Sequence, residues 1–217
     1  MATSTRKDRR TTLTFAFLIG VVVVILALVA ILLATNDDEV TLDDGTTLDE
    51  TPITDAADVE VSGDPLPPFD PEAQDAAIGM PMPSFAGTDL AGDPVELAAE
   101  GGPTAVVYLA HWCPHCQNEV PEIQQLIDDG AVPDDVEIVA VATGNDSSEP
   151  NYPPNVWLHE EGWTPTTLVD DEQQTTAEAS GLAAFPYWVF TDAEGAVAHR
   201  HAGAMPTEAL QEVLESL

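Results

Sequence analysis

The chain has 217 residues, and its 39 acidic against five basic side chains give a formal net charge of −34. This balance excludes nucleic-acid binding, because contacts to phosphate groups need lysine and arginine. Two causes of the acidity stay open: solubility with repulsion from anionic lipid, and adaptation to high salt, where screening relieves the self-repulsion of the chain.

The N-terminal residues carry a membrane signal. Residues 13–34 hold no charge, and about 20 apolar residues span a bilayer. Four of the five basic side chains lie in residues 1–12, so the positive-inside rule predicts a cytoplasmic N-terminus and an extracytoplasmic C-terminal domain. A cleaved signal peptide is the competing interpretation, but its apolar region is typically about 7–15 residues long. No cysteine closely follows residues 13–34, which argues against a lipoprotein anchor, and we predict an uncleaved single-pass signal-anchor.

Residues 35–77 are predicted to form a disordered acidic linker. They are rich in Asp, Thr and Pro and contain no Lys or Arg. Such a composition buries too little apolar surface to offset the loss of chain entropy on folding. Repulsion between the acids should extend the segment, so that the folded domain stands away from the lipid.

Residues 78–217 are long enough for one domain with a hydrophobic core. Apolar runs and helical periodicities alternate along them, and a hairpin at Asp192–Gly195 joins the last two strands. This alternation predicts an α/β domain with a mixed sheet flanked by helices. The strands are expected at 104–110, 136–141, 166–169, 187–191 and 196–202, and the helices at 114–127, 155–161 and 207–217.

The only two cysteines, Cys113 and Cys116, lie where the strand at 104–110 passes into the helix at 114–127. A thiol at the first turn of a helix faces unpaired N–H groups and the positive end of the helix dipole, which favour the nucleophilic thiolate. The spacing Cys-x-x-Cys covers about one helical turn, so the second sulfur can close onto the first. We therefore predict a redox-active disulfide, with Cys113 attacking and Cys116 resolving.

The same residues argue against some other uses of the two cysteines and leave two open. A zinc site needs about four ligands and no second cysteine pair exists, and covalent haem attachment needs a histidine where Gln117 stands. A structural disulfide gains little from closing a two-residue gap. A copper-binding module stays open because thiolates select Cu(I). A thiol peroxidase also stays open, and Arg200, the only basic residue after the anchor, would then have to lie near the sulfur.

The pattern Trp-Cys-x-x-Cys-x-x-Glu-x-Pro at residues 112–121 resembles the TlpA/ResA-like branch of the thioredoxin superfamily, which includes CcmG-type (DsbE-type) proteins. The resemblance covers about Gly79 to Leu217, with an entry hairpin at 79–95 and Phe185-Pro186 before an apolar strand. It implies a thioredoxin-like fold and a membrane-tethered thiol-disulfide oxidoreductase that acts on extracytoplasmic protein thiols or disulfides, in cytochrome c maturation or general disulfide handling. A monomer without cofactor or metal is expected.

The sequence departs from that branch at two points. Ala184-Phe185-Pro186-Tyr187 stands where the family often has Gly-x-Pro-Thr, so two bulky residues flank the proline. The dipeptide Pro114-His115 between the cysteines resembles oxidising DsbA-type sites. A protonated His115 would stabilise the Cys113 thiolate, which exists only in the reduced form, and would make the pair more oxidising. A solvated histidine with a small role is the alternative.

The resemblance also implies roles for residues around the cysteines. Glu119 would transfer protons to the thiols: it lies one turn after Cys116 on the same helical face, and partial burial would raise its pKa toward neutrality. The alternative is an ordinary surface glutamate. Pro186 would be a cis-proline opposite the disulfide, and Trp112, Phe185 and Pro186 would face the substrate, unless Trp112 is a core residue. His111 could tune the site or only pack, whereas His159, His199 and His201 have no informative spacing.

Overall fold

The structure is a computed structural model that describes residues 39–41, 47–49, 58–98 and 102–217. The predicted basic tail and membrane anchor lie outside these residues. Strands β1 (Glu39–Thr41) and β2 (Thr47–Asp49), both within the predicted linker, pair with each other in antiparallel orientation. Among the helices of the described part of the chain, none has the length and apolar character needed to cross a membrane.

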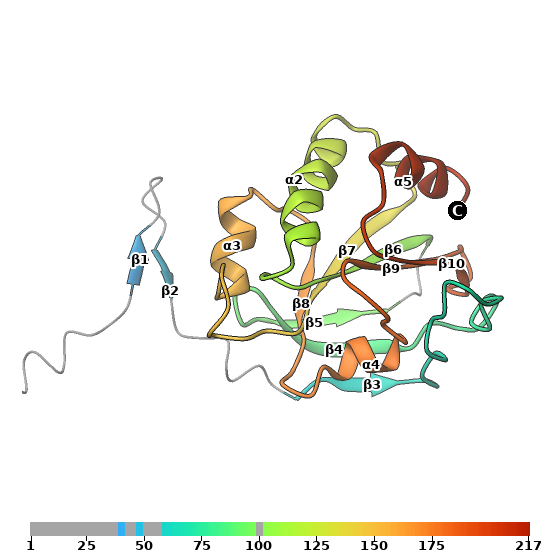
Figure 1. Cartoon of the computed structure of the whole chain (residues 1–217), viewed down its shortest axis with the longest axis horizontal. Helices are drawn as coiled ribbons and strands as arrows, with labels where there is room; N and C mark the ends of the chain where they lie inside the picture. Colours follow the sequence, from blue (N-terminus) through green and yellow to red (C-terminus); the bar gives the residue numbers. More distant parts are fainter. Residues whose placement is uncertain (1–38, 42–46, 50–57, 99–101) are drawn as a thin grey trace, which may run out of the picture. The chain divides into compact units, whose positions relative to one another are not determined.

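Residues 58–217, apart from 99–101, form one α/β domain around an eight-stranded mixed sheet (Figure 1). The strand order is β10-β9-β6-β7-β8-β4-β3, and β5 pairs with β4 off this path. Strands β6, β7 and β8 run parallel, and all other neighbours in this sheet are antiparallel. The strands are β3 (Glu60–Ser62), β4 (Ser84–Asp89), β5 (Pro94–Leu97), β6 (Thr104–Leu109), β7 (Glu137–Ala142), β8 (Thr167–Val169), β9 (Tyr187–Thr191) and β10 (Val197–Ala202).

Helices lie on both faces of the sheet. The sheet separates the hydrophobic core into two layers. In Figure 1, α2 and α5 lie above the sheet, whereas α4 overlaps β3 and β4 in the lower part of the domain. The upper layer holds both cysteines with side chains of α2, α3 and α5, and the lower layer holds side chains of α4, β3 and β4. The described helices are α2 (Pro114–Asp128), α3 (Pro154–Glu160), α4 (Thr175–Ala179) and α5 (Thr207–Leu214), of which α4 is absent from the sequence prediction.

The central strand β6 contributes side chains to both layers of the core. All six of its residues are buried, as expected for a strand covered on both faces. Because successive side chains point to opposite faces, Val107 and Leu109 enter the upper layer while Val106 and Tyr108 enter the lower one. The turn that carries the cysteines therefore directly follows a fully buried strand.

The predicted extent of the linker is wrong for residues 58–77, which belong to the folded domain. Strand β3 adds to the edge of the sheet by antiparallel pairing with β4, and Val59, Leu66 and Ala77 are buried in the lower layer. The backbone packs so closely that a Cβ on Gly181, which has φ +72°, would lie 2.4 Å from the carbonyl oxygen of Pro67. A few apolar residues are enough to fold this segment onto the domain, because they insert into a core that is formed mainly by other segments.

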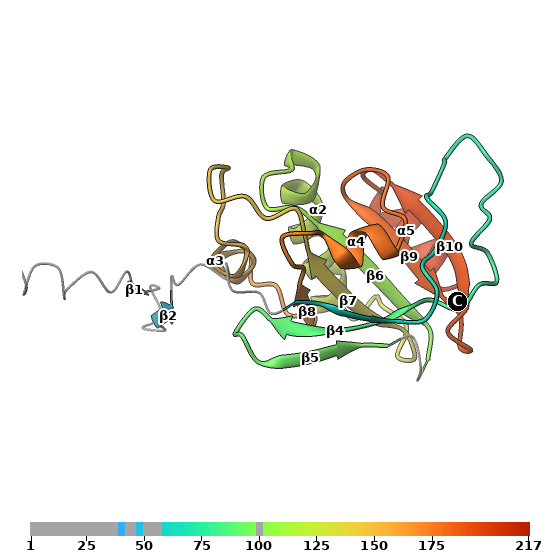
Figure 2. The ribbon, with the colours of Figure 1, turned by 90° about the horizontal axis from the view of Figure 1, so that it is seen from below.

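Arg200 of β10 binds the segment at 58–77 and holds it beside that strand (Figures 1 and 2). Its guanidinium is 2 % exposed and binds the Asp75 carboxylate with two nitrogens, one at 2.9 Å, and this partner holds the pKa of Asp75 below its usual range. The hydrogen bonds of the Arg200 guanidinium are thus made to residues of the lower layer and not to a cysteine. This arginine therefore does not activate a sulfur, as a thiol peroxidase would require. Its further partners are the carbonyl oxygens of Pro67 and Ser180, the hydroxyl of Tyr187 and the ring of Phe69.

Candidate active site

The two cysteines sit where β6 passes into α2, as the sequence predicts. Cys113 is the N-cap residue of α2 with an extended backbone, and no acidic side chain occupies the first turn of that helix. The Cys113 residue is 6 % exposed, whereas Cys116 is 0 % exposed, and both are thiols in this structure. Cys113 is therefore the more exposed of the two cysteines, and it also lies at the positive end of the helix dipole.

A second segment of the chain closes over the Cys113 sulfur. The peptide bond between Phe185 and Pro186 is cis, which confirms the cis-proline expected from the resemblance. The carbonyl oxygen of Phe185 lies 3.9 Å from the Cys113 sulfur. The segment just before β9 is thus brought next to the start of α2, although 72 residues separate the two in sequence.

Trp112 and Phe185 form an aromatic wall beside Cys113. Their rings meet edge to face at 5.6 Å and 86°, and the Trp112 indole donates to the carbonyl oxygen of Gly144 at 2.8 Å. Gly144 has φ +64°, and a Cβ there would meet both rings at 3.5–3.8 Å. Both aromatic residues are only partly buried and pack against the upper core layer, so each keeps part of its surface exposed.

Glu119 is a buried carboxylate in the second turn of α2. It is 4 % exposed, which contradicts the alternative of an ordinary surface glutamate. Oε1 accepts from the indole N–H of Trp188 at 2.8 Å, and Oε2 accepts from the backbone N–H of Met205 at 3.1 Å. Burial raises the pKa of Glu119 to about 7, although both donors oppose that shift. The group therefore changes charge at neutral pH.

Cys116 lies inside the upper core layer on the same face of α2. Burial is the main cause that raises the pKa of the Cys116 thiol, and the charge of Glu119 contributes in the same direction. A thiol with so high a pKa needs a base before it can act as a nucleophile. Glu119 is close enough for its charge to act on this thiol.

His111, directly before Trp112, ties the cysteine turn to the loop at 144–154. Nδ1 lies 2.6 Å from the Pro150 carbonyl oxygen, and Nε2 lies 3.1 Å from the backbone N–H of Asp146. Because that N–H can only donate, Nε2 accepts and the proton sits on Nδ1. Burial lowers the pKa of His111. The ring is a neutral structural link, so His111 packs locally, the second of the two roles the sequence leaves open.

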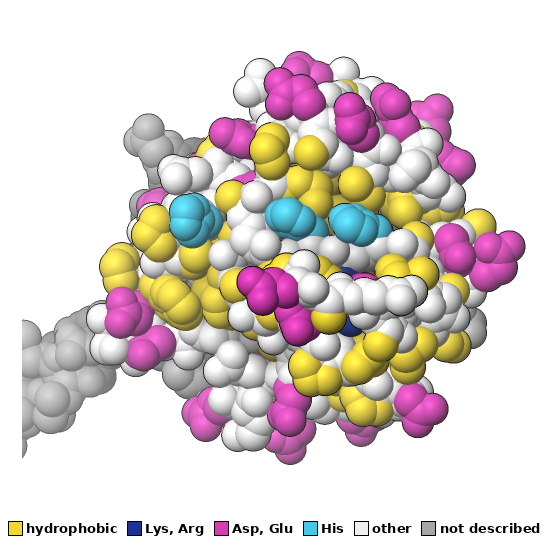
Figure 3. Space-filling model, turned by 45° about the vertical axis from the view of Figure 1, so that its right-hand side comes forward, with side chains coloured by type: hydrophobic (Ala, Val, Ile, Leu, Met, Phe, Trp, Pro, Cys, Tyr) yellow, Lys and Arg dark blue, Asp and Glu magenta, His cyan; other side chains and the backbone are white. Residues whose placement is uncertain are grey.

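The other histidines lie at the surface or near it. His115 is exposed in the first turn of α2. His199 stacks on Phe190 with 5.8 Å between ring centres, and Nε2 of His201 lies 3.3 Å from the Ala204 carbonyl oxygen. Figure 3 shows histidine side chains in one band among hydrophobic and uncharged atoms, with acidic side chains mostly toward the rim of the view. In residues 58–98 and 102–217, no three His, Cys, Asp or Glu side chains gather as a metal site.

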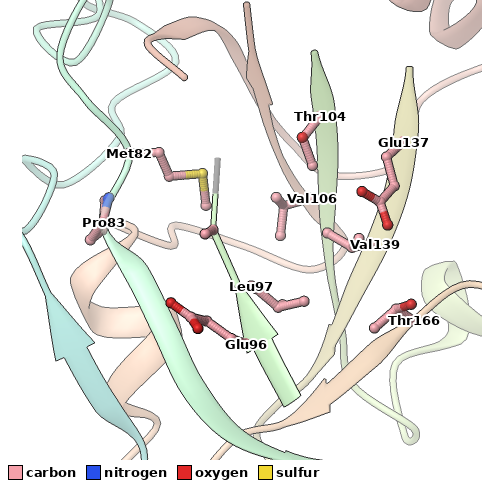
Figure 4. A pocket seen from close by; sticks show the side chains of 10 residues that line it. Met82, Pro83, Glu96, Leu97, Thr104, Val106, Glu137, Val139 and Thr166 are labelled. Atoms are coloured by element: carbon pink, nitrogen blue, oxygen red, sulfur yellow. The ribbon is translucent and has the colours of Figure 1, made fainter. Parts of the chain in front are cut away.

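A cavity of about 170 Å³ lies away from the cysteines (Figure 4). Thr104 and Glu137, the first residues of β6 and β7, line it together with Met82, Glu96 and Leu97. Cys113 follows the opposite end of β6, which at about 3.3 Å per residue is roughly 16 Å away along the strand. This cavity is therefore separate from the candidate active site around Cys113.

Sequence reasoning missed the partners of Glu119. Trp188 lies in β9 and Met205 precedes α5, 69 and 86 residues away from the glutamate. Trp188 shows in the sequence only as one apolar residue of a strand. The backbone N–H of Met205 has no sequence signal at all, because every residue except proline carries such a group.

Comparisons with known proteins agree with this geometry. The family model of Redoxin matches residues 77–217. The thiol:disulfide interchange protein DsbE of Pseudomonas aeruginosa is 27 % identical over 149 residues, which cover 67 % of this chain and 78 % of that protein.

Two solved structures show the same fold. A secreted disulfide oxidoreductase of Mycobacterium tuberculosis, described as homologous to E. coli DsbE, superposes with a TM-score of 0.50 at 23 % identity and covers 61 % of this chain and 96 % of its own. The exposed lipoprotein thioredoxin Etrx1 of Streptococcus pneumoniae gives a TM-score of 0.51 at 22 % identity, with 62 % and 99 % covered. The resemblance first drawn from residues 112–121 is thereby confirmed.

Proposed function

Because this chain belongs to the Redoxin family and is a thiol-disulfide oxidoreductase similar to DsbE-type proteins, we propose that its Cys113–Cys116 pair exchanges disulfides with protein substrates outside the cytoplasm. One observation carries the proposal: a nearly buried sulfur at a helix start, a fully buried second sulfur one turn on, and a carboxylate that titrates near neutrality beside it. The chemistry needs no cofactor.

The first step is attack by the Cys113 thiolate on a substrate disulfide. One new S–S bond forms between Cys113 and a substrate sulfur while the substrate S–S bond breaks, and the second substrate sulfur leaves as a thiolate. Backbone N–H groups at the start of α2 and the helix dipole stabilise the attacking thiolate.

The second step resolves this mixed disulfide. Cys116 gives its proton to the Glu119 carboxylate and its sulfur attacks Cys113. The Cys113–Cys116 disulfide forms while the bond between Cys113 and the substrate breaks, and the substrate sulfur leaves as a second thiolate. Two electrons have then passed from the cysteine pair to the substrate. The same steps in reverse oxidise a substrate dithiol, with Glu119 returning the proton to Cys116.

The substrate is proposed to lie across the aromatic wall of Trp112 and Phe185, against Pro186. The Phe185 carbonyl, 3.9 Å from the Cys113 sulfur, marks where an extended peptide would pass the attacking atom. The partly buried rings offer apolar contact area close to that atom. Among extracytoplasmic thiol proteins, the apocytochromes of cytochrome c maturation and general disulfide substrates both fit such a surface.

The reduction potential of the pair tests the function and the role of His115. We expect a value between those of thioredoxin, about −270 mV, and DsbA, about −120 mV, because the helix start favours the thiolate while the acidic surface opposes it. An exposed cation beside a sulfur is worth about 1 kcal/mol or less, so His115→Ala should make the pair more reducing by about 20 mV or less. Equilibration against glutathione measures both potentials. A lower potential in the wild type than in the variant would reverse the role assigned to His115.

We also propose that residues 13–34 anchor the protein in the membrane with the enzyme domain outside the cytoplasm. The uncharged run and the preceding basic residues support this topology. A reporter fused after Leu217 should be active only outside the cytoplasm, and the protein should remain with membranes after an alkaline wash. Recovery of a shortened, freely soluble protein would instead favour a cleaved signal peptide.

A further inference from the structure

The Glu119 carboxylate is held by neutral donors that come from outside its own helix. The indole N–H of Trp188 in β9 binds one oxygen at 2.8 Å, and the backbone N–H of Met205 binds the other at 3.1 Å. The titratable groups that face the carboxylate are Cys116 and Glu122, both of α2, and neither can supply a positive charge. These two hydrogen bonds are therefore what favours an ionised Glu119 against the penalty of burial.

We propose that Trp188 is a positioning residue for proton transfer: its indole N–H holds the Glu119 carboxylate, ionised and ready to accept a proton, beside Cys116. The proposal rests on the proton transfer assigned to Glu119 above. Trp188 itself does not touch the reacting sulfurs. It acts through the orientation and the charge of the glutamate.

The indole is fixed by packing before any proton moves. Trp188 is 0 % exposed and stacks on Phe190 with 5.3 Å between ring centres and only 6° between the planes. Phe190 in turn stacks on His199. An N–H group fixed in this way loses little freedom when it binds the carboxylate, so it can stabilise the charge without reorganisation.

A neighbouring tryptophan shows that this hydrogen bond is a specific feature of Trp188. Trp157 belongs to the same core layer and is also buried, but its indole N–H has no hydrogen-bond acceptor among the described residues. The contact between Trp188 and Glu119 is not simply what every buried indole in this core must have.

Trp188→Phe tests the proposal, because it deletes the N–H and keeps an aromatic side chain. Losing a hydrogen bond to the charged form raises a carboxyl pKa, so the midpoint of the Glu119 titration, about 7 in the wild type, should rise by about one pH unit. Carbon-13 NMR of the Glu119 carboxyl measures this midpoint. Disulfide exchange should fall about fivefold at pH 7, where a one-unit shift removes most of the ionised form, and should recover as the pH rises.

Trp157→Phe is the matched control, since it removes an indole N–H that has no acceptor. It should leave the Glu119 midpoint unchanged. In a Glu119→Gln background, Trp188→Phe should cause no further change in the pH profile of exchange. A Trp188→Phe protein with the wild-type midpoint, or with exchange reduced equally at every pH, would overturn the proposal.

The wild-type protein provides a second test that does not depend on the folding of a variant. The indole N–H proton resonance of Trp188 should shift with the same midpoint as the Glu119 carboxyl, while that of Trp157 should not follow it. A Trp188 resonance that ignores the titration would contradict the proposal. Absence of disulfide exchange in the wild type would refute the proposed function instead, and these two NMR midpoints would still decide whether Trp188 acts on Glu119.

Discussion

Cys113→Ser should abolish disulfide exchange, whereas Cys116→Ser should stop the reaction at a covalent mixed disulfide with the substrate. The reason lies in the burial of the two sulfurs: Cys113 is 6 % exposed at the helix start, and Cys116 is 0 % exposed behind it. Only the first can be reached by a substrate, and only the second can release one. Non-reducing electrophoresis after mixing the reduced variants with a disulfide-bonded protein measures the adduct.

The same pair of variants separates the alternative functions. A Cu(I) module should lose metal binding to a similar degree in both variants, because each removes one thiolate ligand. A thiol peroxidase should retain peroxide reduction when only the resolving cysteine is replaced. An adduct that accumulates in Cys113→Ser but not in Cys116→Ser would reverse the roles assigned to the two sulfurs.

Glu119→Gln is expected to slow disulfide exchange by about 10²-fold at pH 8, at the low end of the typical gain from general acid–base catalysis. Burial raises the pKa of Glu119 to about 7, so the wild-type carboxylate is mostly protonated below that pH and mostly ionised above it. Because the ionised form accepts the Cys116 proton, the wild-type rate should rise through pH 7. The variant should lack this rise, as rates of mixed-disulfide resolution from pH 5 to 9 would show.

Glu122→Gln is the matched control, since Glu122 lies one turn further along α2 and is exposed. It removes one negative charge near the site without removing the proton acceptor. Its pH profile should stay close to that of the wild type. Equal effects of the two substitutions would assign the role of Glu119 to charge alone, and an unchanged profile in Glu119→Gln would remove it from the mechanism.

The local part of the site could be predicted from the sequence. The junction of strand and helix, the position of Cys113 at the helix start and the common face of Cys116 and Glu119 all follow from spacings of a few residues. The cis bond before Pro186 came from family resemblance rather than from local physics. The extent of the linker was mispredicted, because composition counts apolar residues and cannot tell whether a distant core accepts them.

Local spacing along the chain sets the chemistry of the pair: two thiols one turn apart at a helix start, with a carboxylate one turn further on. The folded arrangement of the chain sets which cysteine is the more exposed, that Glu119 is buried, and that Trp188 and Met205 hold it from 69 and 86 residues away. It also decided that Arg200 binds Asp75, 125 residues earlier, instead of a catalytic sulfur. The physical reason is that such contacts depend on strand order and register, which bring distant segments together and leave no periodicity in the sequence.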